Sequence, residues 1–168
     1  MIKLFLLYLK GEILKSRLEI IKKIIKQNAK SIFIFSNGLT SREANFFQRN
    51  EKSFYLLHAM GEALSIGIGI AKSKKKLKIV VVDGDYNALM GSASWHHLAE
   101  IKNLKYYILN NNISQTTGSQ KLLKLNIPKN LNKKVYVLNI NNKNTLTPNP
   151  EDPILIKKRF VKYLSKLS

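Results

Sequence analysis

The chain has 168 residues, of which 45% are hydrophobic and 9% aromatic, and these proportions are typical of a folded domain rather than a disordered segment. We expect a single domain over residues 1–168, because a chain of this length can bury a sizeable core. The absence of cysteine excludes disulfides, zinc ribbons and cysteine-held iron–sulfur clusters. No apolar run reaches the length of a membrane span, and we expect a cytoplasmic protein.

The charge balance is strongly positive, with 29 Lys and Arg against 10 Asp and Glu and a formal net charge of +19. Such a charge is typical of proteins that bind nucleic acid. Only four of the 29 are arginines, however, and arginine is the residue preferred for base and phosphate contacts. The lysines are dispersed, apart from a block at residues 72–76 that we expect to be a solvated loop. An anionic cofactor, substrate or partner explains the charge equally well. Nucleic-acid binding is therefore the lesser alternative, and salt-sensitive retention on nucleic acid would reveal it.

The first half of the chain predicts two helices around a strand. The opening MIKLFLLYLK imitates a signal peptide, but its apolar stretch is short and charged helix-forming residues follow, so we expect an amphipathic helix. Residues 31–38, SIFIFSNG, predict a short buried strand that ends in a turn. Thr40 or Ser41 would cap the next helix, with Glu43 in its first turn. Within residues 11–27, apolar residues stand at helical spacing at Ile13, Leu14, Leu18, Ile21 and Ile24.

The rest of the chain alternates helices with strands. Segment 54–73 is apolar and spotted with glycines, which favours a closely packed helix. Segment 76–85, KLKIVVVDGD, predicts a central strand that is apolar on both faces, as in buried parallel strands. The following segments predict, in order, a helix over 87–103, strands over 104–112 and 133–141, and a closing helix over 150–167. This alternation predicts an α/β fold, three layers α/β/α around a mainly parallel sheet.

Two clusters of polar residues follow neighbouring strands of that sheet. Asp85 comes after a tight turn at Gly84, and three asparagines, residues 110–112, end the next strand. Asp-Gly and Asn-Asn pairs also occur in ordinary turns. In parallel sheets, however, ligands bind outside the carboxyl ends of the strands, where both clusters fall. A helix N-terminus binds phosphate, and a carboxylate beside it is compatible with phosphate if a divalent cation lies between them. The two clusters together therefore predict a metal–diphosphate site.

The two stretches DGDYNALMG and YYILNNNISQTTGSQ resemble the diphosphate-binding motif of thiamine diphosphate enzymes. Three further segments, SNGLTSRE, AMGEALSIGIGIA and TLTP…IKKRFVKYL, resemble the phosphonopyruvate decarboxylase and sulfopyruvate decarboxylase beta-subunit family. The resemblance covers nearly the whole chain. It implies thiamine diphosphate and Mg²⁺ as cofactors, with Mg²⁺ held by the Asp85 carboxylate, the Asn111 amide oxygen and the Ile113 carbonyl.

The same resemblance implies the remaining cofactor contacts. Met60 matches the apolar residue that bends thiamine into a V shape, and the carbonyl of His58 would accept a hydrogen bond from the aminopyrimidine. The diphosphate would be bound by backbone N–H groups of three residues, Gly84, Tyr86 and Asn87.

The chain departs from the family at several of these positions. Tyr86 stands where the family has glycine, and a positive φ there would cost tyrosine about 1–2 kcal/mol. His58 replaces a small residue, and Glu62 replaces a histidine that could face substrate.

The resemblance also implies a partner. It covers only the diphosphate domain, so a second, pyrimidine-domain subunit would supply the activating glutamate. No glutamate of this chain stands out for that role. We expect no catalytic residue in this chain and no activity without the partner.

Some other polar residues have alternative interpretations. His96 and His97 point about 100° apart on a helix, which favours a helix surface or subunit contact over a metal site. Trp95 is expected to pack at the same place, and Glu100 lies one turn on. Arg42 is open between an anionic substrate and a surface salt bridge. Substrate contact and helix capping are both open for Thr116, Thr117 and Ser119.

The sequence thus predicts the cofactor-binding subunit of a two-subunit 2-oxo acid decarboxylase, with phosphonopyruvate or sulfopyruvate as the substrate. An α₂β₂-like assembly is one hypothesis. Another split thiamine-dependent carbon–carbon lyase or ligase, or a degenerate non-catalytic partner subunit, remain as alternatives.

Overall fold

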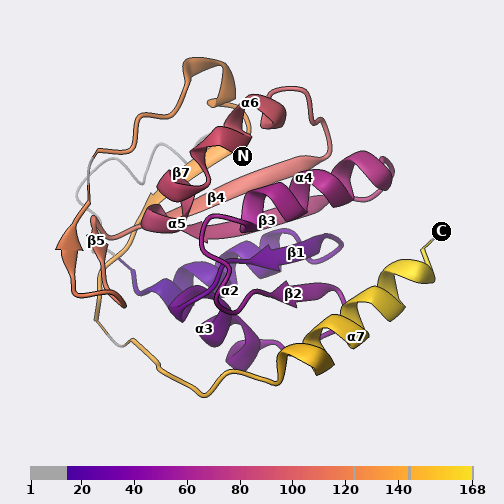
Figure 1. The fold of residues 1–168 in the computed structure, drawn as a ribbon, viewed down its shortest axis with the longest axis horizontal. Helices are drawn as coiled ribbons and strands as arrows, with labels where there is room; N and C mark the ends of the chain where they lie inside the picture. The colour runs from indigo at the N-terminus through magenta and orange to yellow at the C-terminus, as the bar shows by residue number, and fades with distance from the viewer. Residues whose placement is uncertain (1–14, 123, 144, 168) are drawn as a thin grey trace.

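The computed structural model describes residues 15–122, 124–143 and 145–167. The expected amphipathic start of the chain, with Ile13 and Leu14, lies outside these residues. Five strands form one sheet in the order β2-β1-β3-β4-β7, and every neighbouring pair is parallel (Figure 1). The strands are β1 (Ile32–Phe35), β2 (Ser53–Tyr55), β3 (Ile79–Gly84), β4 (Leu104–Asn110) and β7 (Val135–Asn139).

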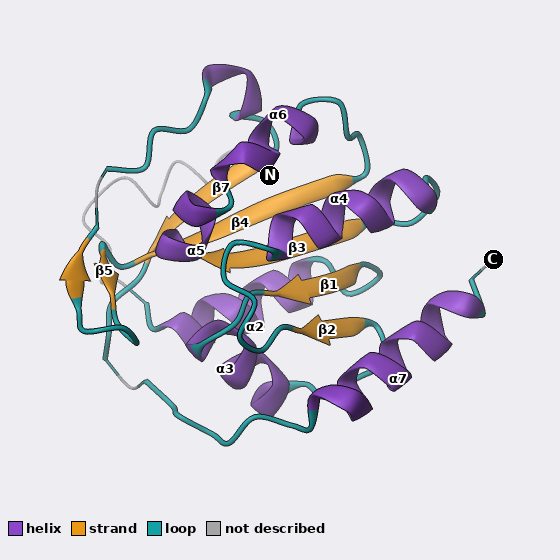
Figure 2. Ribbon diagram, in the orientation of Figure 1, coloured by secondary structure: helices purple, strands orange, loops and turns teal. Residues whose placement is uncertain are grey.

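Helices cover both faces of this sheet, as the coloured elements of Figure 2 show. One face packs against α4 (Ala63–Ser73) and α6 (Trp95–Leu98), and the other against α2 (Arg17–Gln27) and α3 (Leu39–Phe47). The closing helix α7 (Pro153–Ser165) lies along β2 and contributes to both core clusters. The predicted three-layer α/β/α fold is therefore confirmed.

The local sequence explains where two of the helices begin. Ser16 caps α2 by accepting from the Glu19 N–H, and the Glu19 side chain accepts in turn from Ser16, which completes a capping box. The Asp152 carboxylate accepts from the Ile154 N–H at 2.7 Å, with Pro153 in the first turn of α7. The predicted cap of α3 is wrong. Gly38 is its N-cap, and Thr40 and Ser41 lie inside the helix.

Strand β2 was not predicted from the sequence. Its three residues lie just before and within the apolar segment in which only a helix was expected. Parallel pairing with β1 extends the sheet, and the Tyr55 ring stacks on Phe35 with centroids 5.5 Å apart. Pairing with a neighbour, rather than local propensity, therefore defines this strand. Helix α4 begins only at Ala63.

The single continuous helix predicted over residues 87–103 is wrong, because the structure divides this segment into separate short helices. The chain forms α5 (Asp85–Met90), a 3₁₀ turn η2 (Ser92–Ser94) and then α6. Gly91 separates them, and a Cβ at this position would lie 2.3 Å from the carbonyl oxygen of Gly61. The break lets two distant backbone segments touch, so it is a tertiary requirement that helical periodicity does not reveal.

A small antiparallel pair, β5 (Ile113–Ser114) and β6 (Gln120–Lys121), follows β4, and a 3₁₀ turn η3 (Lys129–Leu131) precedes β7. Among the described residues, no helix is both long and apolar enough to cross a membrane.

Candidate functional site at the carboxyl ends of β3 and β4

Asp85 lies where β3 ends and α5 begins. Register pairs Gly84 of β3 with Leu109 of β4, so Asp85 stands beside the asparagines that follow β4. The side chain is buried, and one carboxylate oxygen, Oδ1, accepts from the Tyr86 N–H at 2.8 Å. The other oxygen, Oδ2, accepts from the N–H groups of Asn111 at 3.0 Å and Asn112 at 2.8 Å. Backbone donors from both strand ends therefore converge on this carboxylate.

The turn after β4 depends on a left-handed residue. Asn112 has φ 60, a conformation that asparagine tolerates better than most residues. This turn directs two successive N–H groups at Asp85, and it brings the Ile113 carbonyl back toward the same point. The run of asparagines thus serves the geometry of the turn as well as supplying a side chain.

The three predicted metal ligands lie together. One atom of the Asn111 side-chain amide is 3.1 Å from Asp85 Oδ2 and 2.9 Å from the Ile113 carbonyl oxygen. With the amide nitrogen in this place, the contacts are two hydrogen bonds. With the amide oxygen there, it faces two further hard oxygen ligands at 3.1 and 2.9 Å, close to the separation of about 3 Å between adjacent ligands around an octahedral Mg²⁺ with bonds of about 2.1 Å. The residues therefore fit a magnesium ion.

Burial and charge act in opposite directions on Asp85. Burial raises the pKa of this carboxyl, while the N–H groups of Tyr86, Asn112 and Asn111 and the positive charge of Arg17 lower it. A bound cation would favour the ionised form further. Its neighbour Asp83 is more strongly affected. Burial raises the pKa of Asp83 to about 6, despite a 2.8 Å hydrogen bond from the Tyr106 hydroxyl.

The loop that carries Met60 is hydrogen-bonded to the start of α5, just after Asp85. The Asn87 side-chain oxygen accepts from the Gly61 N–H at 3.2 Å, and Gly61 packs directly against Gly91. Met60 is half-buried in this loop, and His58 is exposed with φ 62, a left-handed conformation unusual for a non-glycine residue. The structure therefore brings the loop bearing the predicted thiamine contacts next to the predicted diphosphate turn.

The predicted diphosphate donors are partly engaged within the chain. The Gly84 N–H donates to the Ser36 hydroxyl at 3.2 Å, and the Tyr86 N–H donates to Asp85. Tyr86 lies in α5 and is not among the residues with positive φ, so its replacement of glycine carries no backbone strain. A diphosphate bound here would compete for the N–H of Tyr86 while a cation drew the Asp85 carboxylate away.

The other predicted residues fall outside this cluster. His96 and His97 are exposed on α6 with Glu100 beyond it, and no group of three metal-binding side chains occurs in the described part of the chain. Trp95 is a packing residue, as expected, but it is buried in the core of the chain rather than at a contact shared with His96 and His97. The solvated loop predicted over residues 72–76 is confirmed in part, because residues 72 and 73 form the exposed end of α4 and only residues 74–76 lie in the loop that follows.

For the remaining side chains, the structure excludes one of the two roles that the sequence left open. Arg42 takes part in none of the three ion pairs found among the described residues, so its predicted salt bridge is absent there. Three residues for which helix capping was one alternative are exposed in the turn between β5 and β6: Thr116, Thr117 and Ser119. A strand rather than a helix follows them, so the capping alternative is wrong. Glu62 is exposed and directly precedes α4.

Sequence reasoning missed a group of polar residues behind the oxygen cluster. Arg17 and Glu43 are both buried, and Arg17 Nη2 donates to the Gln115 side-chain oxygen at 2.7 Å. Gln115 and Asn142 both contact the Asn111 amide. The available signal was the scarcity of arginine, because the chain has only four.

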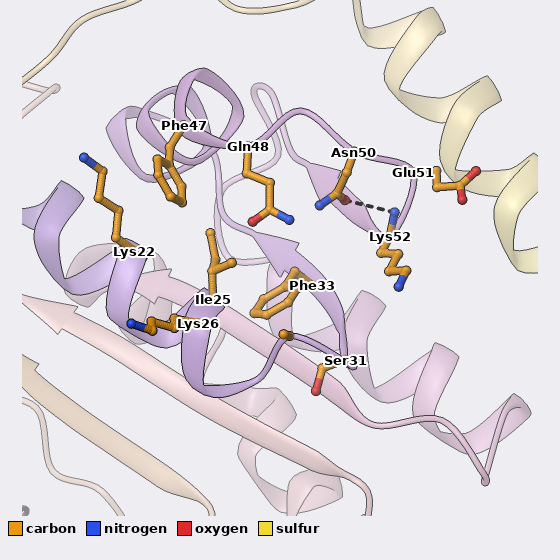
Figure 3. Close-up of a pocket in the computed structure, with 11 residues that line it drawn as sticks. Lys22, Ile25, Lys26, Ser31, Phe33, Phe47, Gln48, Asn50, Glu51 and Lys52 are labelled. Carbon is orange, nitrogen blue, oxygen red and sulfur yellow. Dashed lines mark hydrogen bonds between the residues drawn. The ribbon is translucent and has the colours of Figure 1, made fainter.

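A separate hollow of about 610 Å³ lies between α2 and the segment joining α3 to β2 (Figure 3). Phe33, Ser31 and Lys52 line it at the amino ends of β1 and β2, with Lys22 and Lys26 at its rim. It lies at the edge of the sheet opposite to Asp85 and contains none of the predicted site residues.

The fold and this cluster define a parallel α/β domain with a candidate magnesium site at the carboxyl ends of two neighbouring strands. Residues 37–148, two-thirds of the chain, match the family model described as thiamine pyrophosphate enzyme, C-terminal TPP binding domain. The chain therefore belongs to the thiamine pyrophosphate enzyme family through this domain.

Three similar proteins place the chain more closely. It is 39% identical over 108 residues to the sulfopyruvate decarboxylase beta subunit of Methanocaldococcus jannaschii, covering 62% of this chain and 57% of that protein. It is 35% identical over 92 residues to phosphonopyruvate decarboxylase of Streptomyces hygroscopicus, covering 54% of this chain and 23% of that protein. The solved 2-oxoglutarate:ferredoxin oxidoreductase of Magnetococcus marinus has the same fold, with a TM-score of 0.50, 20% identity and coverage of 63% of this chain and 37% of that chain.

Proposed function

We propose that this chain is the thiamine diphosphate- and Mg²⁺-binding subunit of a two-subunit 2-oxo acid decarboxylase. The observation that carries this proposal is the position of the Asn111 amide, which lies 3.1 Å from Asp85 Oδ2 and 2.9 Å from the Ile113 carbonyl oxygen. A second support is the similarity to relatives whose names contain sulfopyruvate decarboxylase subunit beta and phosphonopyruvate decarboxylase.

In this proposal each part of the site has a distinct task. Asp85, Asn111 and Ile113 hold Mg²⁺, and the backbone N–H groups of Gly84, Tyr86 and Asn87 face the diphosphate. Met60 supports the thiamine and the His58 carbonyl accepts from its aminopyrimidine. Bound thiamine diphosphate supplies a thiazolium ring that takes up the electron pair left when carbon dioxide departs from a 2-oxo acid.

The proposed partner is a subunit with a pyrimidine-binding domain that supplies the activating glutamate. The chain spans 57% of the length of the beta subunit from Methanocaldococcus jannaschii, and that relative is itself named as a subunit. The proposed substrate is a small anionic 2-oxo acid such as sulfopyruvate or phosphonopyruvate. A chain with a formal charge of +19 would attract such a substrate over a distance of about 8–10 Å at ordinary salt.

The experiment is to produce the chain with the product of a neighbouring gene that encodes a pyrimidine domain, and to measure carbon dioxide release from both substrates. We expect release only when the partner, thiamine diphosphate and Mg²⁺ are all present. Asp85→Ala should abolish it, whereas Asp152→Ala, which removes a helix cap far along the chain, should leave it intact.

Another split thiamine-dependent lyase or ligase would bind the cofactor in the same way but release no carbon dioxide from these acids. A second candidate, a non-catalytic partner subunit, is favoured by the engaged N–H groups of Gly84 and Tyr86 and by the exchange of a family histidine for Glu62. That candidate predicts a stable complex that binds no thiamine diphosphate.

A further inference from the structure

The orientation of the Asn111 side-chain amide decides whether the oxygen cluster can hold a cation. One end of the amide faces Asp85 Oδ2 and the Ile113 carbonyl, and the other end faces Gln115 and Asn142. A cation needs the amide oxygen at the first end, because an N–H₂ group has no lone pair to offer it. The amide must then present its nitrogen to Gln115 and Asn142.

The side-chain amide of Gln115 can adopt only one orientation where it contacts Asn111. Arg17 Nη2 lies 2.7 Å from Gln115 Oε1, and a guanidinium has donors only, so the Gln115 oxygen must point toward it. The same oxygen lies 3.4 Å from the Asn111 amide nitrogen and accepts from it. Turning the Asn111 amide over would set oxygen against oxygen at this contact.

Asn142 does not fix the orientation by itself. Its Oδ1 accepts from the Asn111 nitrogen at 2.8 Å, but Asn142 is exposed and its own amide can turn to donate instead. The Arg17 guanidinium cannot change its role in this way, because it has donors only.

Arg17 is itself held in place from two sides. Its side chain is 8% exposed, and Nη1 lies 3.6 Å from the Oε1 of Glu43, whose side chain is fully buried. Glu43 Oε1 also accepts from the Leu146 N–H at 3.0 Å. An arginine that leaves water in this way keeps a defined position, because its charge is compensated only there.

We propose that Arg17 is a positioning residue that acts through Gln115 to turn the Asn111 amide oxygen toward Asp85 and Ile113, and so prepares the site for its cation. This inference rests on the proposed Mg²⁺ site. It adds a polar chain in which two residues outside the diphosphate motif, Glu43 and Arg17, act on two residues within it, Gln115 and Asn111.

The test measures the affinity of Mg²⁺ with thiamine diphosphate by calorimetry, on the chain and on its complex with the partner. Arg17→Met combined with Glu43→Gln removes the donor together with its counter-charge, which avoids leaving a buried carboxylate unpaired. We expect affinity to fall about five- to tenfold, the equivalent of one hydrogen bond. The matched control, Arg159→Met with Glu151→Gln, removes an ion pair of 2.7 Å elsewhere in the fold and should change affinity less than twofold.

A rescue variant separates positioning from mere support of the fold. Gln115→Glu presents only acceptors to Asn111, so it fixes the amide without help from Arg17. Added to Arg17→Met/Glu43→Gln, it should restore affinity to within about threefold of the wild type. Gln115→Leu in the wild-type background should weaken binding as much as the loss of Arg17.

Failure of the rescue, or unchanged affinity without Arg17, would overturn the inference while leaving the proposed function intact. Absence of binding by the wild type in both forms would instead overturn the proposed function, and the inference with it.

Discussion

The contact between Gly61 and Gly91 gives the sharpest prediction about how the fold supports the site. A methyl group at Gly91 would lie 2.3 Å from the Gly61 carbonyl oxygen and 3.1 Å from its carbonyl carbon, so the backbone must move. Gly91 has φ −86 and ψ 12, which alanine adopts readily. The cost of Gly91→Ala is therefore steric, and we expect a loss of about 1–3 kcal/mol in the free energy of unfolding.

Gly69→Ala is the matched control. Gly69 lies within α4, and nothing approaches within 4 Å of a Cβ placed there. Alanine should stabilise this helix by about 0.5–1 kcal/mol. Urea unfolding of the two variants and the wild type measures both effects, and each kcal/mol corresponds to about 2–4 °C in Tm for a chain of this size. Wild-type stability in Gly91→Ala would refute the close approach, and with it the placement of the Met60 loop.

Two further predictions concern single residues near the site. His58→Gly should stabilise the chain by up to about 1 kcal/mol in thermal unfolding, because it relieves a left-handed φ of 62 at an exposed position, and a loss of stability would contradict that backbone conformation. Asp83→Asn should gain stability relative to the wild type as pH rises from 4 to 7. The raised pKa of Asp83, about 6 against an ordinary 3.8, means that the folded wild type loses stability as this carboxyl ionises. The gain should reach about 2–3 kcal/mol in urea unfolding of the metal-free protein, and an equal difference at both pH values would be incompatible with the raised pKa.

The alternation of strands and helices was predictable because the central strands contain continuous apolar runs. Residues 79–82 and 106–109 are such runs, and Asp85 and Asn111 come just after the ends of these two strands. The three residues of β2 could not be predicted in the same way, since pairing with β1 defines them. The break at Gly91 likewise depends on a partner thirty residues away in the sequence.

The buried polar chain behind the site was also beyond local patterns. Arg17 and Gln115 are 98 positions apart, and only the folded chain shows that their contact fixes an amide next to Asp85. Helical periodicity places Arg17 within an amphipathic helix expected over residues 11–27, where an arginine is usually taken for a surface residue.

The most direct test of the central claim is calorimetric titration of thiamine diphosphate into the complex of this chain with its partner, with and without Mg²⁺, for the wild type and Asp85→Ala. The account predicts binding that requires both Mg²⁺ and the Asp85 carboxylate. Equal affinity without Mg²⁺ or in Asp85→Ala, or no binding by the wild type, would contradict it.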